Sequence, residues 1–215
     1  MRHFLLLLML FPVFTAYSQY QSPYLKEENV KREIPLPKYY ISAGSGIQYK
    51  YGLLGLGLGY RVTETTILEL NTGIGAYGTK VGISGIFNSI GKNAWCPYLG
   101  FSKTSGVNEL NTEFEVVYNG LTSKVNTSVY LDPVNTLNAG IQKQFVTKRG
   151  NRFTIDLGYA ISLNKQVYGF NDKTILVGNQ LVPADEVKFS NNQKSAIQIL
   201  GPSGITIGVS YNYGF

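Results

Sequence analysis

Few side chains of this 215-residue chain have the chemistry that catalysis or metal binding requires. The only histidine, His3, comes just before an apolar segment typical of a secretory signal peptide. Histidine is the natural general base near neutral pH and a common zinc ligand. Without it, the mature chain has neither a Ser-His nor a His-Asp pair. We therefore predict that the protein is not an enzyme and uses no metal or other cofactor.

Two further motifs have a simpler structural explanation. Cys96 follows Trp95 in an alternating segment, and we interpret it as a small wall residue. Gly55, Gly57 and Gly59 resemble a phosphate-binding glycine motif, but no helical pattern follows them. We therefore expect these glycines to line the polar face of a strand.

Five charged residues alternate with apolar neighbours: Arg61, Glu69, Glu113, Glu115 and Asp156. Alternate side chains of a strand point to opposite faces, so these five are expected together on the inner face of a closed sheet. There they would form a polar network in which Arg61 pairs with a carboxylate, because buried charge must be paired or neutralised. The alternative is a narrow cation-preferring passage, since four acids would face one base.

The last eleven residues, Ile205–Phe215, show the strand pattern most clearly. Odd positions are large and apolar or aromatic, and even positions are small or polar. This period of two predicts a strand with one face in an apolar medium and the other in a polar one. About ten residues is the length of a tilted strand that crosses a bilayer.

Similar alternation recurs along the chain. We predict eight strands: Tyr39–Tyr49, Leu53–Val62, Thr66–Gly78, Ala94–Lys103, Glu109–Tyr118, Asn135–Phe145, Arg152–Ser162 and Ile205–Phe215. The fold class is then all-β, an eight-stranded antiparallel up-and-down transmembrane barrel over residues 39–215. Inward glycines would leave room that Tyr40, Tyr77 and Tyr98 could refill.

The connections between these strands differ in length. Short turns are expected at Thr63–Thr65, Thr104–Asn108 and Val146–Asn151, on the side of the two termini. The opposite side would carry Lys50–Gly52, Thr79–Asn93, Asn119–Val134 and Leu163–Ser203. Short turns on one side and long loops on the other are typical of outer-membrane barrels. Within the longest loop, Lys173–Val177 and Val187–Ser190 are expected to form a hairpin that extends the last two strands.

The N-terminal region divides into two segments. Residues 1–18 have a basic start, a short apolar core and a small-residue exit, which predicts a signal peptide cleaved after Ser18. Residues 19–38 are polar, contain three prolines and include the mixed-charge run Lys26–Glu33, which predicts a periplasmic leader.

Alternation alone does not say which face of the barrel lies inside. A soluble lipid carrier would have its apolar face inward. The aromatic strand ends, the loop asymmetry and the terminal Phe215 favour the membrane arrangement instead. The formal net charge of +6 is scattered rather than clustered, so no nucleic-acid partner is expected.

Several segments resemble a known class of protein. Pro97–Phe101, Gly204–Tyr211 and the Ser18-Gln19 junction are similar to the porin-family-like barrel domain of Bacteroidota, small outer-membrane β-barrel proteins. The resemblance implies eight antiparallel strands with tails in the periplasm. It also implies that Tyr211, Tyr213 and Phe215 form a C-terminal signal for the barrel-assembly machinery. It provides no catalytic residue.

These features together predict a location and a general role. We expect a non-catalytic barrel in the cell outer membrane, embedded in outer-membrane lipid. Its role would be structural or interactive, either alone or as an accessory subunit of a secretion, uptake or assembly complex. An outer-membrane or periplasmic partner would bind the long loops or the leader. The alternatives are a narrow channel for small solutes or cations and a lipid-active enzyme with a histidine-free site.

Overall fold

The computed structural model describes residues 37–89, 93–165 and 167–215. The chain divides into two units, Met1–Glu33 and Ile34–Phe215, and the described residues belong to the second. The predicted signal peptide and nearly all of the predicted leader lie outside the described residues. Within the described ranges, no helix is long and apolar enough to cross a bilayer.

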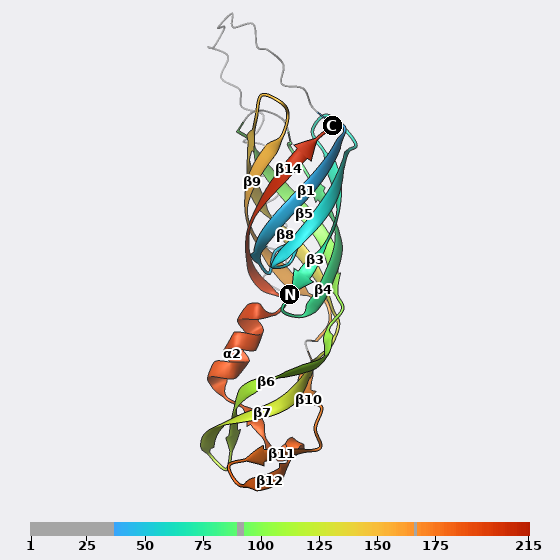
Figure 1. Cartoon of the computed structure of the whole chain (residues 1–215). Coiled ribbons are helices and arrows are strands. Elements are labelled where there is room, and N and C mark those ends of the chain that lie inside the picture. The colour runs from blue at the N-terminus through green and yellow to red at the C-terminus, as the bar shows by residue number, and fades with distance from the viewer. Residues whose placement is uncertain (1–36, 90–92, 166) are drawn as a thin grey trace, which may run out of the picture. The chain divides into compact units, whose positions relative to one another are not determined.

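Eight strands form a closed antiparallel barrel in the order β1-β14-β9-β8-β5-β4-β3-β2 (Figure 1). Their bounds are β1 Tyr39–Ile47, β2 Leu54–Arg61, β3 Ile67–Gly75, β4 Gly78–Ile86, β5 Trp95–Thr104, β8 Val134–Val146, β9 Arg152–Ser162 and β14 Gly204–Gly214. The first and last strands close the barrel, pairing from Tyr40 with Gly214 to Ile47 with Ile207. The predicted all-β, eight-stranded antiparallel barrel is confirmed.

One strand of the barrel was predicted as a loop. Apart from its first residue, Gly78, strand β4 lies within the expected loop Thr79–Asn93, yet it pairs with β3 on one side and β5 on the other. Its alternation is weak because Gly85 occupies an outward position and the buried Ile86 an inward one. The apolar pattern that indicates an outward face is therefore interrupted before the strand ends.

One predicted barrel strand lies outside the barrel. Strand β6, Val107–Tyr118, pairs with β7, Leu121–Leu131, which was expected to be part of a loop. Asn119 and Gly120 connect them with φ of 49° and 77°, the left-handed conformations that a tight two-residue hairpin turn needs. Alternation indicates only that a strand has one covered face, so it did not distinguish β6 from a barrel strand.

Two connections of the barrel build a separate folded region, residues 105–133 and 163–203, which we call the extra-barrel module. It contains the four-stranded sheet β10-β7-β6-β13 and the hairpin β11-β12. The remaining bounds are β10 Tyr168–Phe170, β11 Thr174–Val177, β12 Gln180–Pro183, η1 Ala184–Glu186, β13 Lys188–Phe189 and α2 Asn191–Leu200. The expected hairpin is wrong in its pairing, because β11 pairs with β12 whereas β13 pairs with β6.

The module has its own apolar core. Phe189 contacts the rings of Phe114, Tyr168 and Phe170, and stacks on the last with centroids 4.4 Å apart. Tyr77, expected inside the barrel, belongs instead to this core. Burial raises the pKa of Tyr77 to about 12, and its hydroxyl donates to the carbonyl of Ile197.

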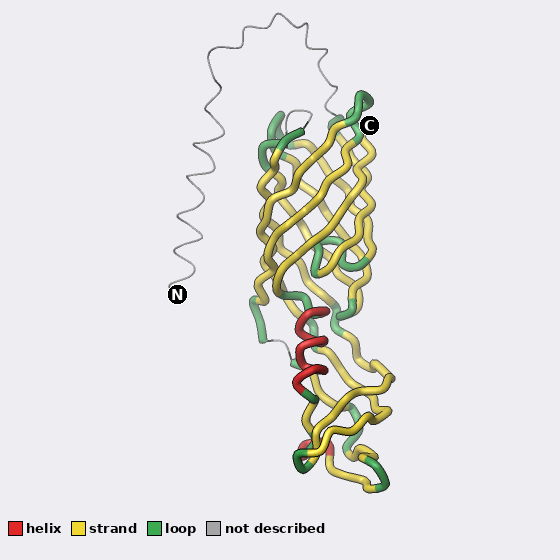
Figure 2. Tube along the Cα trace, turned by 90° about the vertical axis from the view of Figure 1, so that its left-hand side faces the viewer, coloured by secondary structure: helices red, strands yellow, loops and turns green. Residues whose placement is uncertain are grey.

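The two ends of the barrel differ in the length of their connections (Figure 2). At the terminal end, where Tyr39 and Phe215 exchange backbone hydrogen bonds, the connections are 62–66, 87–94 and 147–151. At the distal end they are 48–53, 76–77, 105–133 and 163–203. Both long excursions that form the module leave from the distal end, so the predicted short turn Thr104–Asn108 is wrong.

The exchange of β4 for β6 in the barrel can be tested with proline. Ile83→Pro removes a ladder donor from the middle of β4 and should prevent barrel closure. Thr112→Pro in β6 should disturb only the module. The measurement is the shift in gel mobility between unheated and heated samples, which reports a folded barrel. A folded barrel in the Ile83→Pro variant, or its loss in Thr112→Pro alone, would contradict the strand assignment.

Candidate functional site

The outer surface of the barrel is apolar on all eight strands. Exposed outward side chains include Ile41, Leu54, Leu56, Leu58, Leu68, Leu70, Ile74, Val81, Ile83, Leu99, Phe101, Phe145, Ile155, Leu157, Ile205, Ile207 and Val209. Leu54 is 68% exposed and Leu58 62%, values far from those of a core residue. An apolar belt of this extent is unusual on a protein surface, where large exposed apolar patches mark interaction sites.

Aromatic rings gather near the terminal end of the belt. Tyr39 lies 5.4 Å from the ring of Tyr60 and 6.1 Å from that of Phe215, measured between centroids. The residues of the predicted assembly signal, Tyr211, Tyr213 and Phe215, are outward and between 46% and 62% exposed. They are accessible on the outer surface of the last strand and at its end.

The interior of the barrel is polar and charged. Six charged side chains are buried among the described residues: Lys50, Arg61, Glu69, Lys80, Arg152 and Asp156. Of the predicted network, Arg61, Glu69 and Asp156 lie in this interior. The placement of Glu113 and Glu115 was wrong, because both lie on β6 in the module, where the side chain of Glu113 is 55% exposed. The predicted balance of four acids to one base becomes two acids to four bases.

The distal half of the interior is filled by the connection between β1 and β2, residues 48–53, which we call the plug loop. Its side chains Tyr49, Lys50 and Tyr51 point into the barrel and are 0%, 3% and 0% exposed. The turn is possible because Gln48 and Gly52 take left-handed conformations, with φ of 51° and 74°. The amide of Gly52 then donates to the carbonyl of Tyr49 across 2.8 Å.

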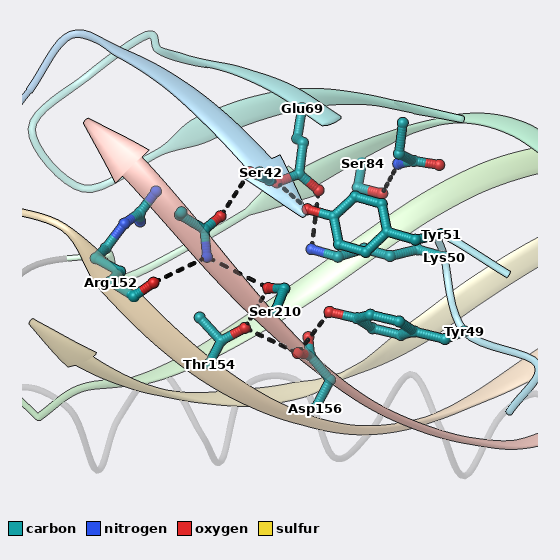
Figure 3. A network of polar contacts seen from close by, with 12 residues as sticks. Ser42, Tyr49, Lys50, Tyr51, Glu69, Ser84, Arg152, Thr154, Asp156 and Ser210 are labelled. Atoms are coloured by element: carbon teal, nitrogen blue, oxygen red, sulfur yellow. Dashed lines mark hydrogen bonds and ion pairs between the residues drawn. The ribbon is translucent and has the colours of Figure 1, made fainter. Parts of the chain in front are cut away.

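The plug loop is held by two carboxylates of the barrel wall (Figure 3). Lys50 Nζ lies 2.9 Å from Glu69 Oε1 in an ion pair that is almost fully buried. The Tyr51 hydroxyl donates to Glu69 Oε2 across 2.8 Å, and the Tyr49 hydroxyl donates to Asp156 Oδ2 across 2.7 Å. Asp156 Oδ2 also accepts from Thr154. Each carboxylate therefore receives donors from both the loop and the wall.

Lys80 adds a third attachment. Its Nζ donates to the carbonyl oxygen of Tyr49 across 2.9 Å and to that of Gln48 across 3.5 Å. No carboxylate of the described residues forms an ion pair with Lys80. The ammonium group thus stabilises the backbone of the plug loop through its carbonyl dipoles.

Glycines of the wall make room for the tyrosine rings. A Cβ added at Gly44 would overlap the ring of Tyr51, and one added at Gly208 would overlap that of Tyr49. The inward glycines predicted from the sequence therefore fit specific rings. Tyr40 and Tyr98 lie inside, 1% and 4% exposed, as predicted. The two rings of the plug loop were not predicted.

The terminal half of the interior is filled by two arginines around Tyr40. Arg61 donates to the carbonyl oxygens of Glu64 and Ser89, at 2.5 and 3.1 Å, and to the Tyr40 hydroxyl at 2.8 Å. Arg152 donates to Ser89 Oγ across 2.7 Å. Its guanidinium carbon lies 3.9 Å from the centroid of the Tyr40 ring.

Three interior cations were not predicted from the sequence: Lys50, Lys80 and Arg152. Lys50 and Lys80 stood in segments interpreted as loops, so no face was assigned to them. Arg152 begins β9 and has the same parity as Thr154 and Asp156. Parity alone could have identified Arg152 as an inward residue.

The side chains considered above for catalysis or metal binding were His3 and Cys96. His3 lies outside the described residues, and no group of three or more metal-ligating side chains forms among those that are described. Cys96 is buried, and its thiol contacts the carbonyl oxygen of Asn88 at 3.4 Å. The arrangement provides a packed polar network that holds a loop in place.

No family model, curated protein or solved structure matches the chain. The resemblance to porin-family-like barrels of Bacteroidota therefore stays a prediction. The structure bears out its coarser part, a small eight-stranded antiparallel barrel.

The buried ion pair can be tested by a double-mutant cycle. Glu69→Gln leaves Lys50 buried without its partner and should destabilise the barrel by about 3–5 kcal/mol. Lys50→Met should also destabilise it, and the double variant should lose less than the sum of the two, because the partners act on each other. Urea unfolding in lipid vesicles measures these values. Additive losses would contradict a direct interaction.

The fit between glycine and tyrosine predicts a size compensation. Gly44→Val should displace the Tyr51 ring and cost about 1–3 kcal/mol of stability. In the double variant Gly44→Val/Tyr51→Ala, the loss should be smaller than the sum of the single changes. Gly75→Val is the matched control, since a Cβ there meets only the carbonyl oxygen of Gly78, at 3.8 Å. Equal losses at Gly44 and Gly75 would contradict the fit.

Proposed function

We propose that the protein is a non-catalytic β-barrel of the cell outer membrane that presents the extra-barrel module to a protein partner. The observation that carries this proposal is the inverted polarity of the barrel: apolar side chains outside, charged side chains inside. A bilayer accepts a closed barrel because every strand edge is paired and the outer face is apolar. The predicted signal peptide agrees with export to that membrane.

The filled interior favours an anchoring role over transport. An eight-stranded barrel has an interior just wide enough for side chains to fill. Here the plug loop fills the distal half and the two arginines fill the terminal half. The alternative function, a cation-preferring passage, depended on inward carboxylates that included Glu113 and Glu115. Both of these residues lie outside the barrel. The interior instead has more bases than acids, which argues against selection for cations.

The module provides the surface for a partner. On the outer face of the β11-β12 hairpin, Leu176 lies directly opposite Leu181, and these residues are 58% and 73% exposed. If the termini are periplasmic, this hairpin belongs to the side of the barrel that faces the cell exterior. An exposed apolar pair on a folded module is a candidate site for a protein contact. The protein would then be an accessory subunit of a larger outer-membrane complex.

The partner proposal is tested by purification of the tagged protein from native outer membranes in mild detergent. The wild type should retain a stoichiometric outer-membrane component, identified by mass spectrometry. Leu176→Asn/Leu181→Asn should remove it, whereas Leu121→Asn, also 73% exposed in the wild type, should not. Recovery of the barrel alone, with an untagged strain as reference, would overturn the accessory role and leave a free-standing structural one.

Because the interior is filled, we expect no ion conductance through the protein in planar bilayers. The inserted wild type should show no steady unitary conductance, because the interior is filled from both ends. Insertion is verified by the mobility shift between unheated and heated samples recovered from the same vesicles. Regular conductance steps from the folded protein would overturn the anchoring role and favour a channel.

A further inference from the structure

Arg61 and Arg152 form an unusual pair inside the barrel. Both are buried, at 9% and 3% exposed, and both donate to Ser89, one to its carbonyl oxygen and one to its hydroxyl. Their guanidinium carbons lie 5.7 and 3.9 Å from the centroid of the same Tyr40 ring. Two like charges are therefore brought close together out of water, an arrangement that costs free energy unless a counter-charge is present.

The described residues form no ion pair with either arginine. Their ion pairs are Lys50 with Glu69 and Lys124 with Glu113, and neither involves an arginine. Glu69 and Asp156 are already engaged by the plug loop. The partners of the two guanidinium groups are carbonyl oxygens, hydroxyl groups, the amide of Gln144 and the ring of Tyr40.

One arginine nitrogen at this end of the barrel can still donate a hydrogen bond. Arg152 Nε is a buried nitrogen with no hydrogen-bond partner among the described residues. Arg61 is the last residue of β2 and Arg152 the first of β9, so both lie at the terminal mouth of the barrel. A buried arginine donor next to a second guanidinium at a barrel mouth has the geometry of an oxyanion site.

We propose that the arginine pair Arg61 and Arg152 at the terminal mouth of the barrel binds a phosphate-type oxyanion. Arg152 supplies its free Nε–H, and Arg61 supplies the second positive charge. The ring of Tyr40 contacts both guanidinium groups, and its hydroxyl accepts a hydrogen bond from Arg61. Ser89 holds one nitrogen of each arginine. The oxyanion is either a free phosphate group from solution or the phosphate of a lipid headgroup.

The experiment uses the full mature protein in an uncharged detergent, titrated with inorganic phosphate and followed by calorimetry and by thermal unfolding. The wild type should bind phosphate and unfold at a higher temperature in its presence, because a ligand of the folded state stabilises that state. Arg152→Gln and Arg61→Gln should each weaken binding at least about tenfold, the effect of losing one charge-assisted hydrogen bond.

Lys80→Gln is the matched control. Lys80 is also a buried interior cation that forms no ion pair with the described residues, but it lies in the distal half of the barrel. Its substitution should leave phosphate affinity within about twofold of the wild type. Arg152→Lys keeps the charge without the planar fork and should fall between wild type and Arg152→Gln. The gel mobility shift verifies that each variant is folded.

Two arms distinguish the source of the phosphate. In nanodiscs that contain phosphatidylglycerol, the affinity for inorganic phosphate should fall if a lipid headgroup reaches the site. If the affinity in phosphatidylcholine nanodiscs equals that in detergent, the site is assigned to free phosphate. Either result supports the site. No binding by the folded wild type, or an equal loss in Lys80→Gln and Arg152→Gln, would overturn it. If chloride at equal ionic strength produced the same thermal shift, general ionic screening would explain the stabilisation, and the site would also be overturned.

Discussion

The cost of burying charge governs the interior of this barrel. An ion moved out of water loses several kcal/mol of solvation unless partners replace the water. Glu69 meets this requirement with an ammonium group, a tyrosine hydroxyl and the hydroxyl of Ser42. Because two of these donors come from the plug loop, the carboxylate cannot be satisfied unless the loop folds inward. The loop in turn fits only because Gly44, Gly57 and Gly208 have no side chains where its rings lie.

The same constraint separates the two halves of the interior. In the distal half, Glu69 compensates Lys50, backbone carbonyl oxygens hold Lys80, and the loop is fixed from several directions. In the terminal half, Arg61 and Arg152 are solvated by carbonyl oxygens and an aromatic face, without a carboxylate. The halves therefore differ in charge although both are filled. A barrel with this interior is better suited to holding its own shape than to letting solutes pass.

The module is a second consequence of the barrel's construction. Strands of a closed barrel have no free edges, so additional structure has to be inserted in the connections. Both insertions leave from the distal end, and the four-stranded sheet needs both of them: β6 and β7 come from one, β10 and β13 from the other. Phe189 of the second insertion packs on Phe114 of the first. The module thus depends on the barrel to bring its two halves together.

The sequence by itself determined the fold class, because a period of two with apolar outward residues indicates strands whatever their partners. Seven of the eight barrel strands follow from that period, as in Ile205–Phe215, and so does the inward placement of Arg61, Glu69 and Asp156. The alternation of apolar and polar side chains does not show which strands pair with each other, however. Only the tertiary structure decided that β4 belongs to the barrel and β6 to the module, and hence that Glu113 and Glu115 lie outside. It also decided that Lys50 turns inward, because the direction of a loop depends on the carboxylate and glycines that receive it from strands distant in sequence.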